Sequence, residues 1–231
     1  KVNSGEYKLM GLAPYGEPKY AKKILDNIID VKEDGSFWLN QDFFNYTTGL
    51  TMTNMEFSNL FGNKVRKPEN ESLTQFHMDI ASSIQKVTEK VVLLITKNLS
   101  KEYKIPNLCL AGGVALNCVA NGKILEAGHF KKIWIQPASG DSGGALGAAL
   151  LLWFKKLKNN RFPSKTDSMQ GSFLGPHFKQ DNIEKLLIDS GAKFHTMDDD
   201  SLINSTAKSL KEGKAIGWFQ GRMEFGPRAL G

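Results

Sequence analysis

The sequence has few cysteines and no long apolar run. Its two cysteines, Cys109 and Cys118, give neither a disulfide framework nor a paired metal-ligand spacing. Both sit among apolar residues, so we expect them to be reduced, buried and inert, as in a cytoplasmic protein. The most apolar stretch, residues 143–154, is shorter than the roughly 18–20 residues of a membrane span. Because it is rich in glycine and alanine, it predicts a packed helix and no membrane association.

Histidine is sparse as well, and no two histidines have the spacing of a helical metal-ligand pair. The histidines are His77, His129, His177 and His195. His77 adjoins an apolar helical stripe, so we expect it to be structural, and we expect no histidine site. An initiator Met and a basic-then-apolar leader are also missing at Lys1, and the sequence stops at Gly231 inside a motif. These ends predict an internal fragment of a longer protein.

The composition and charge are those of a globular protein. Of the 231 residues, 41% are hydrophobic and 23% are charged, which is enough apolar material for a packed core. The net charge is +6, but the lysines are spread in short groups that aromatic residues do not interleave. We therefore interpret the charge as a solvated surface, with binding of small phosphate compounds as the next interpretation. Nucleic acid is not the expected partner, although a non-catalytic nucleotide-binding or nucleic-acid-binding module stays an alternative, and nucleic-acid binding of this kind would be salt-sensitive.

Predicted strands alternate with predicted helices, which indicates an α/β fold. The helix at 73–102 has the clearest pattern, because its apolar residues recur at helical spacing. Two strand-turn-helix units follow it, and their loops lie where open α/β sheets place ligands. The predicted segments are a loop at 5–16, helices at 19–29, 54–61, 73–102, 116–127, 145–156, 180–190 and 199–212, strands at 36–39, 108–111, 133–136 and 215–219, and a linker at 158–170.

The segment Ala111–Asn117 places two glycines between a strand and a helix. Gly112 and Gly113 carry no side chain that would keep the backbone away from a ligand. The N–H groups at the start of the following helix favour phosphate, and Asn117 could hydrogen-bond a ribose or phosphate oxygen. A tight strand-to-helix turn without a ligand explains the same pattern.

The segment Pro137–Ala149 places Asp141 among small residues at the second strand-helix junction. Asp141 is either a helix N-cap or an oxygen ligand to a hard cation such as magnesium or an iron-type ion. Small neighbours such as Gly143 leave room for a bulky anion, which is compatible with a nucleotide. Close packing of the following helix explains the same small residues.

Two further segments carry cationic side chains beside glycines. Gly217–Gly231 contains Arg222 and Arg228, whose planar groups suit phosphate or carboxylate oxygens. Pairs between these arginines and carboxylates of the protein are the alternative. Gly5–Gly16 contains Lys8, which could approach a phosphate or lie on an ordinary surface loop.

Taken together and in this order, the motifs resemble the NodU/CmcH carbamoyltransferase family. The matching stretches are Lys8–Gly16, Ala111–Asn117, Pro137–Ala149, Phe173–Pro176 and Gly217–Gly231. The resemblance implies the C-terminal part of an actin-like (ribonuclease H-like) carbamoyltransferase domain at 1–157. A linker at 158–170 and the N-terminal part of a YrdC-like domain at 171–231 would follow.

The family resemblance implies an ATP-dependent O-carbamoyltransferase. In this reaction carbamoyl phosphate is hydrolysed to carbamate, which reacts with ATP to give carbamoyl adenylate and pyrophosphate. The carbamoyl group then passes to a hydroxyl of a small-molecule acceptor. The implied cofactors are ATP and a divalent metal, either iron-type or magnesium, and a homodimer is one assembly we consider.

The resemblance also assigns roles to individual positions. Asp141 matches a metal-ligating carboxylate, and Arg222 and Arg228 match arginines that bind carbamoyl phosphate and nucleotide. The positions that match nucleotide-binding segments are Lys8, Gly112, Gly113, Asn117 and Gly143. The family's metal site also needs a pair of histidines upstream, which this sequence lacks. We therefore expect the fragment alone to be inactive and to bind metal poorly.

A second class of enzyme shares some of these features. Sugar or acid kinases and the tRNA threonylcarbamoyl transferase are also actin-like, with strand-Gly-Gly-helix and strand-Asp-Gly-helix segments. The arginine motif after the linker argues against both.

Overall fold

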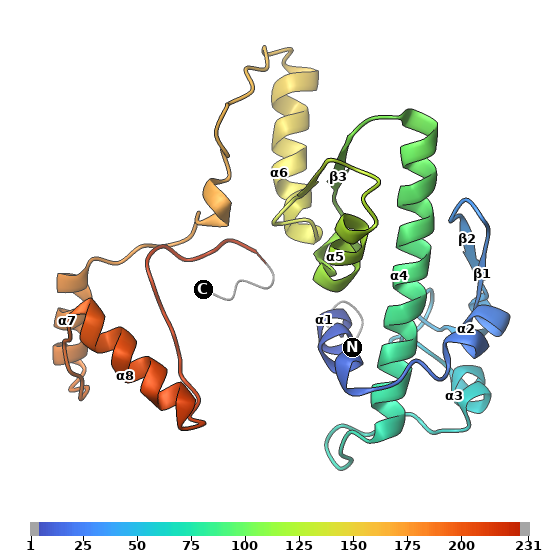
Figure 1. Cartoon of the computed structure of the whole chain (residues 1–231), viewed down its shortest axis with the longest axis horizontal. Coiled ribbons are helices and arrows are strands. Elements are labelled where there is room, and N and C mark those ends of the chain that lie inside the picture. The colour runs from blue at the N-terminus through green and yellow to red at the C-terminus, as the bar shows by residue number, and fades with distance from the viewer. Residues whose placement is uncertain (1–4, 227–231) are drawn as a thin grey trace. The chain divides into compact units, whose positions relative to one another are not determined.

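The computed structural model describes residues 5–226, and the chain divides after Gln136 into two compact units (Figure 1). The helices of the first unit are α1 (Glu6–Leu12), α2 (Ala21–Asn27), α3 (Met55–Phe61), α4 (Gln75–Tyr103) and α5 (Cys118–Glu126). Its 3-10 turns are η1 (Ala13–Tyr15), η2 (Gln41–Phe43) and η3 (Gly113–Leu116). Its strands are β1 (Ile29–Val31), β2 (Phe37–Leu39), β3 (Asn107–Leu110) and β4 (Lys132–Ile135).

Helix α4 is the central element of the first unit, as the apolar periodicity of 73–102 predicts. Figure 1 shows α5 and β3 along one side of it and α2, β1 and β2 along the other. His77 helps to start this helix, because its Nδ1 accepts a hydrogen bond from the backbone N–H of Thr74 (3.1 Å). Lys104 ends it in a left-handed conformation (φ +53°). The histidine is therefore structural, as expected from its place beside the apolar stripe.

The hydrophobic core lies between α2, α3 and α4. Ile24, Ile28, Phe61 and Val87 are buried together. Tyr20 adds an edge-to-face contact with Phe61 at a centroid distance of 5.6 Å. These contacts bury the apolar stripe of α4, so tertiary packing stabilises this long helix more than helix propensity does.

Two small sheets accompany this core. Strands β1 and β2 pair antiparallel, with Ile29 opposite Leu39. Strands β3 and β4 pair in parallel, from Asn107 opposite Lys132 to Leu110 opposite Ile135. The predicted strand-helix alternation is thus present, and the structure is mixed α/β.

The second unit contains α6 (Asp141–Leu151), which continues into a π-helical turn, η4 (Leu152–Lys156). The 3-10 turn η5 (Gln170–Ser172) and helices α7 (Gln180–Asp189) and α8 (Asp199–Lys211) follow. Helix α8 begins as its acidic residues predict, because the Asp198 side chain accepts a hydrogen bond from the N–H of Ser201 (2.8 Å).

Four expectations from the sequence are wrong. The segment 5–16 is not a loop, since it forms α1 and η1. No strand forms at 215–219, although those residues are described. Cys109 and Cys118 are exposed, not buried. The apolar helix at 145–156 is not packed, since none of the described residues of α6 and η4 is buried and Trp153 is 53% exposed.

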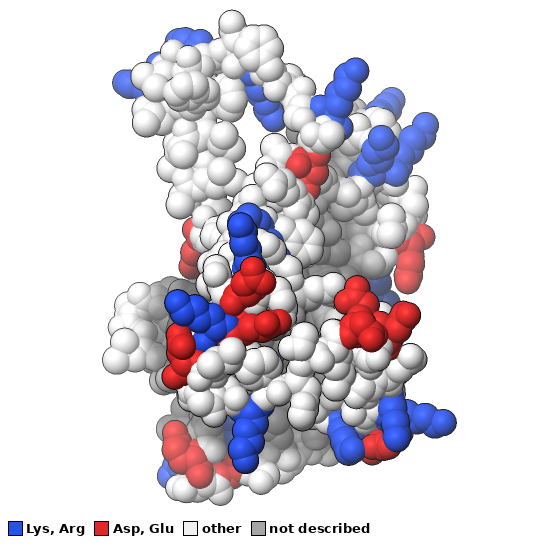
Figure 2. Space-filling view, turned by 90° about the vertical axis from the view of Figure 1, so that its left-hand side faces the viewer, with Lys and Arg blue, Asp and Glu red and all other residues white. Residues whose placement is uncertain are grey.

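Charge is distributed over the surface rather than gathered. On the face drawn in Figure 2, groups of Lys and Arg are separated by Asp, Glu and uncharged residues. This distribution agrees with the interpretation of the net charge as a solvated surface. Within residues 5–226, no helix combines the length and the apolar character that crossing a membrane requires.

Candidate functional site

The first motif, Lys8–Gly16, packs on α4 through α1 and η1. A Cβ atom at position 16 would lie 2.1 Å from both the carbonyl carbon and the oxygen of Met78, and 2.5 Å from the backbone nitrogen of Asp79. Cβ atoms do not approach other heavy atoms this closely, so only glycine allows this contact between the two backbones. Gly16 therefore sets how near the end of the motif comes to α4.

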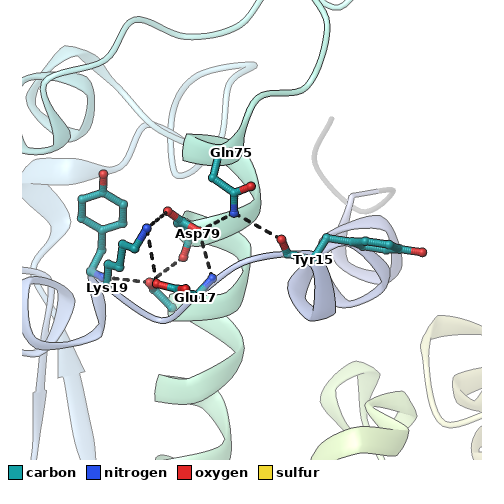
Figure 3. A network of polar contacts seen from close by, with 7 residues as sticks. Tyr15, Glu17, Lys19, Gln75 and Asp79 are labelled. Atoms are coloured by element: carbon teal, nitrogen blue, oxygen red, sulfur yellow. Dashed lines mark hydrogen bonds and ion pairs between the residues drawn. The ribbon is translucent and has the colours of Figure 1, made fainter.

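A buried carboxylate on α4, Asp79, holds the segment that follows the first motif (Figure 3). Its Oδ1 accepts hydrogen bonds from the backbone N–H of Glu17 (2.9 Å) and the amide of Gln75 (2.8 Å). Its Oδ2 accepts one from the ammonium of Lys19 (3.1 Å). The Gln75 amide also donates to the carbonyl of Tyr15 (3.2 Å). We call Glu17, Lys19, Gln75 and Asp79 the Asp79 cluster.

The contacts of the Asp79 cluster favour the ionised forms of Asp79 and Lys19. The N–H of Glu17, then the amide of Gln75 and the ammonium of Lys19, hold the pKa of Asp79 below its ordinary value. In return, Asp79 and Glu17 raise the pKa of Lys19. The cluster is thus an ionised clamp at neutral pH that fastens residues 15–19 to α4. Sequence reasoning missed it because Asp79 lies 62 positions from Glu17.

Lys8 is exposed on α1 and stands apart from the Asp79 cluster. Its ammonium lies 5.8 Å from the centroid of the Tyr7 ring. This contact is at the outer limit of a cation–π interaction, so it leaves the ammonium accessible to an anion.

The second motif joins β3 to α5 through an open glycine turn. Gly112 has φ +100° and ψ 163°, a backbone conformation that residues other than glycine do not adopt without strain. Among the described residues, no heavy atom lies within 4 Å of the Cβ positions of Gly112 or Gly113. The 3-10 turn η3 follows directly, and α5 begins at Cys118, two residues later than predicted. The space beside the two glycines is therefore empty of other described residues.

Asn117, the last residue of the second motif, is held by α4. Its Oδ1 accepts hydrogen bonds from the N–H of Ala120 (3.1 Å), which caps α5, and from Nε2 of Gln85 (3.2 Å). Its Nδ2 donates to Oε1 of Gln85 (2.9 Å). The Gln85 amide also donates to Glu89 (3.0 Å), whose other oxygen lies 3.8 Å from Lys123 on α5. Sequence reasoning found Asn117 but missed Gln85 and Glu89.

A cavity of about 200 Å³ lies on α4 between the first motif and the start of α5. Its lining residues are Met10, Ala13, Pro14, Pro18, Ser82, Gln85, Lys86, Glu89 and Val119. Three of them belong to the first motif, and Val119 lies two positions after Asn117. The first motif thus lines this cavity directly, while the second motif is linked to it through Gln85, which pairs with Asn117.

Asp141, in the third motif, is the first residue of α6, and the N-cap position belongs to Gly140. The interpretation of Asp141 as the N-cap is therefore wrong, and its carboxylate is exposed. A Cβ atom at position 143 would lie 2.1 Å from the carbonyl oxygen of Ala138. Gly143 is thus required by the turn that leads into α6.

The loop before α6 has a polar atom without a partner. Within residues 5–226, the hydroxyl of Ser139 is buried and makes no hydrogen bond. Such a group destabilises the fold by roughly 1–3 kcal/mol unless a ligand or water satisfies it. This hydroxyl is therefore available to a ligand with a hydrogen-bonding group.

The described residues do not assemble a metal site. Across 5–226 there is no group of three or more His, Cys, Asp or Glu residues that could hold a metal ion. The accessible carboxylate of Asp141 is a single ligand, so these residues do not fit a bound metal by themselves.

The fourth motif lies beside the Phe173–Pro176 motif. The Gly175 N–H donates to the carbonyl of Met223 (2.9 Å), and the Met223 N–H donates to the carbonyl of Pro176 (2.9 Å). A Cβ atom at position 175 would lie 2.8 Å from the Met223 oxygen, so glycine permits this pairing. Nη1 of Arg222 donates to the carbonyl of Gly175 (2.7 Å). Arg222 is otherwise exposed, which leaves its remaining N–H groups accessible.

The third and fourth motifs also come into contact. A Cβ atom at position 226 would lie 3.6 Å from the carbonyl oxygen of Pro137, an ordinary van der Waals distance. Arg228 lies outside the described residues. Of the two predicted arginines, Arg222 alone can therefore be placed, on a segment held by backbone hydrogen bonds.

Comparison with known proteins identifies two family matches. The family described as "Carbamoyltransferase N-terminus" matches residues 1–150, and "Carbamoyltransferase C-terminus" matches residues 207–231. An uncharacterized Synechocystis sp. protein, sll1178, is 59% identical over all of this chain and 38% of its own length. The nodulation protein NolNO of Sinorhizobium fredii is 35% identical over 98% of this chain and 31% of its own length.

A named carbamoyltransferase is also similar. The 3'-hydroxymethylcephem-O-carbamoyltransferase of Streptomyces clavuligerus is 32% identical over 54% of this chain and 21% of its own length. The chain thus spans less than two fifths of the length of each of these three relatives. Because the N-terminal family model covers more than half of the sequence and the relatives include nodulation proteins and a cephem O-carbamoyltransferase, the chain belongs to the NodU/CmcH-type carbamoyltransferase family.

Proposed function

We propose that this chain supplies the nucleotide cleft of an ATP-dependent O-carbamoyltransferase. The observation that carries the proposal is the open turn at Gly112 and Gly113, with its glycine-only conformation and its free backbone. The open space beside the two glycines would let a phosphate chain lie against the backbone, next to the start of the following helix. The family membership supplies the reaction, and the turn supplies a place for the nucleotide.

Several groups would share the charge of the nucleotide. The backbone N–H groups after Gly112 and the accessible ammonium of Lys8 are donors in the first unit. The second unit, taken by itself, has one further candidate donor to an anion, the buried hydroxyl of Ser139, which has no hydrogen-bond partner among the described residues. Donors fixed by the fold need no reorganisation when charge develops, which is how such sites accelerate reactions.

Arg222 is proposed to bind carbamoyl phosphate. Its bond to the Gly175 carbonyl fixes one edge of the guanidinium, and the exposed edge can face a phosphate. In this proposal residues 1–157 are part of an actin-like domain, residues 158–170 a linker and residues 171–231 the start of a YrdC-like domain. Arg228 belongs to the same motif and would contribute a second guanidinium.

The proposed reaction has three steps. Water attacks carbamoyl phosphate to give carbamate and inorganic phosphate. A carbamate oxygen then attacks the α-phosphorus of ATP, which forms carbamoyl adenylate and expels pyrophosphate. Last, the acceptor hydroxyl attacks the carbamoyl carbon, AMP leaves, and the hydroxyl proton passes to solvent or a base. A divalent metal, of iron or magnesium type, would help to orient the acceptor hydroxyl in the complete enzyme.

The acceptor is proposed to be a hydroxylated small molecule. The name of the Streptomyces clavuligerus relative describes carbamoyl transfer to a hydroxymethyl group. The same chemistry at this chain's cleft requires an alcohol oxygen as the nucleophile. The net charge of +6 would favour anionic reactants at the surface.

The test uses the full-length protein that contains this chain, with ATP, carbamoyl phosphate and a panel of hydroxylated acceptors. We expect pyrophosphate release and an acceptor whose mass rises by one carbamoyl group. ADP with a phosphorylated acceptor would instead identify a kinase and refute the proposal. The 231-residue chain by itself is expected to release no pyrophosphate.

A matched pair of variants ties the activity to the open turn. Gly112→Ala places a side chain at φ +100°, whereas Gly128→Ala places one at φ +66° in a position that is equally free of neighbours. Both strain the backbone, but we expect only Gly112→Ala to raise the KM for ATP. An equal rise in the KM for ATP in both variants would show that the turn is not part of the nucleotide site.

A further inference from the structure

Two polar side chains are buried on α4 where a packed helix normally presents apolar ones. Gln85 and Glu89 are each 7% exposed, close to the buried Val87 and Val91. Polar groups in such positions destabilise a fold unless every one of them is hydrogen-bonded. Their presence on this helix therefore calls for a function that valine or leucine could not perform.

The bonds of Gln85 connect α4 to the second motif. Its Oε1 accepts from Nδ2 of Asn117 (2.9 Å), and its Nε2 donates to Oδ1 of Asn117 (3.2 Å). This reciprocal amide pair joins residues 32 positions apart. Asn117 ends the turn that begins at Gly112, and Asn121 fixes the middle of that turn through the Ala115 carbonyl (2.7 Å).

Glu89 determines which way the Gln85 amide faces. A carboxylate only accepts hydrogen bonds, so the Gln85 nitrogen must be the atom at Glu89 (3.0 Å). The Gln85 oxygen is then left for the Asn117 amide. Lys123, from α5, forms an ion pair with the other Glu89 oxygen at 3.8 Å. The orientation of the whole pair is thus specified from two sides.

We propose that Gln85 is a positioning residue that, through Asn117, holds the turn at Gly112 and Gly113 in place for the phosphates of the nucleotide. The inference rests on the proposed function of that turn. Asn117 contributes to nucleotide binding by this placement, since its oxygen already has two donors, Ala120 and Gln85. Glu89 acts one step further away, by orienting Gln85.

The test variant is Gln85→Met, in the full-length protein. Methionine has a similar length and fills the site, but it cannot make the amide pair. A loosened turn should weaken the phosphate contacts, so we expect the Kd and KM for ATP to rise between about tenfold and about a hundredfold. The Kd for adenosine, which has no phosphates, should change by less than about threefold. The kcat for pyrophosphate formation should change little.

Thr96→Val is the matched control. Thr96 is also buried on α4 (3% exposed), but its hydroxyl bonds only to helix carbonyls, at Val92 (2.8 Å) and Leu93 (3.2 Å). The substitution removes a buried hydroxyl from the same helix without touching the turn. It should lower the melting temperature and leave the KM for ATP unchanged. A merely structural role for Gln85 predicts the same result for Gln85→Met.

A second variant, Asn117→Ser, approaches the pair from the other side. Serine still caps α5 but cannot pair with Gln85. We expect the same selective loss of ATP binding, and no further loss in the double variant, because the two residues act as one unit.

Two results would overturn the proposal: an unchanged KM for ATP in Gln85→Met, or an equal loss of ATP and adenosine binding. Wild-type protein that binds ATP without releasing pyrophosphate would refute the proposed reaction, and the comparison of ATP with adenosine would still test Gln85. Wild-type protein that does not bind ATP would refute both.

Discussion

Replacing Gly16 by alanine tests how the first motif is fitted to α4. The added Cβ would lie 2.1 Å from the Met78 carbonyl carbon and oxygen. A normal contact is roughly 3.5 Å, so residues 15–17 must move away from the helix by about 1.4 Å. The Glu17 N–H now lies 2.9 Å from Asp79, and a shift of that size breaks this bond. Alanine at position 16 therefore forces the segment and the Asp79 cluster apart.

The size of the effect follows from the kind of atoms that collide. Overpacking destabilises a fold by about 1–3 kcal/mol. Because both atoms of Met78 belong to the helix backbone and cannot rotate away, we expect the upper value, about 3 kcal/mol. For a chain of this length each kcal/mol lowers the melting temperature by about 2–4 °C. Gly16→Ala should therefore melt about 6–12 °C below the wild type.

Gly11→Ala is the control, in the same motif. Gly11 lies inside α1, and no heavy atom of residues 5–226 lies within 4 Å of its Cβ position. Alanine is the better helix former by about 1 kcal/mol, so this variant should melt at or above the wild-type temperature. Thermal unfolding followed by circular dichroism compares the two, and amide hydrogen exchange at residues 15–20 should rise only in Gly16→Ala. Melting temperatures within about 2 °C of each other would refute the packing argument.

Two further predictions concern carboxylates. Hydrogen bonds and Lys19 lower the pKa of Asp79, so its contribution to stability is present above about pH 4 and is lost as the pH falls through the lowered folded-state pKa. The melting temperature of Asp79→Asn should therefore drop less on acidification than that of the wild type. An equal drop in both proteins would contradict this. Asp141→Asn should lower the metal content of the full-length protein, measured by elemental analysis. Its melting temperature should not change, because Asp141 does not cap α6. An unchanged metal content would exclude Asp141 as a ligand.

Local patterns predicted most of the regular elements. The apolar spacing of 73–102 locates α4 to within two residues of its start and one of its end. The helices at 54–61, 180–190 and 199–212 are similarly close. These elements are specified by side chains within a few positions of one another, which is the range that periodicity and caps can report.

The wrong predictions depend on partners that a local pattern does not contain. The apolar run 145–156 predicts a helix with an apolar face. It does not tell whether another element packs against that face, and in the structure α6 and Trp153 are exposed. Cys109 illustrates the same point on a strand. Its neighbours Leu108 and Leu110 are partly buried, while Cys109 points to the other, exposed face of β3.

The candidate site could be predicted from the sequence in its glycines, its charged residues and Asn117. The Gly112–Gly113 turn, Asp141 and Arg222 stand out because their types are unusual in their positions. Gln85 and Asp79 do not, since each is one polar residue in a long amphipathic helix. Their roles follow from partners 32 and 62 positions away, and those distances exist only in the folded chain.

The structure separates two kinds of glycine that look alike in the motifs. Gly16 and Gly143 are explained by packing, because a Cβ at either position would lie 2.1 Å from a backbone atom of the same unit. Gly112 and Gly113 have no such neighbour among the described residues, yet Gly112 keeps a conformation that only glycine adopts freely. Gly128 also combines a positive φ with open space, so the family membership, and not the conformation alone, makes Gly112 the candidate to contact a nucleotide. Comparing Gly112→Ala with Gly128→Ala therefore tests whether the second motif contacts the nucleotide, whereas Gly16 and Gly143 shape the backbone within their own units.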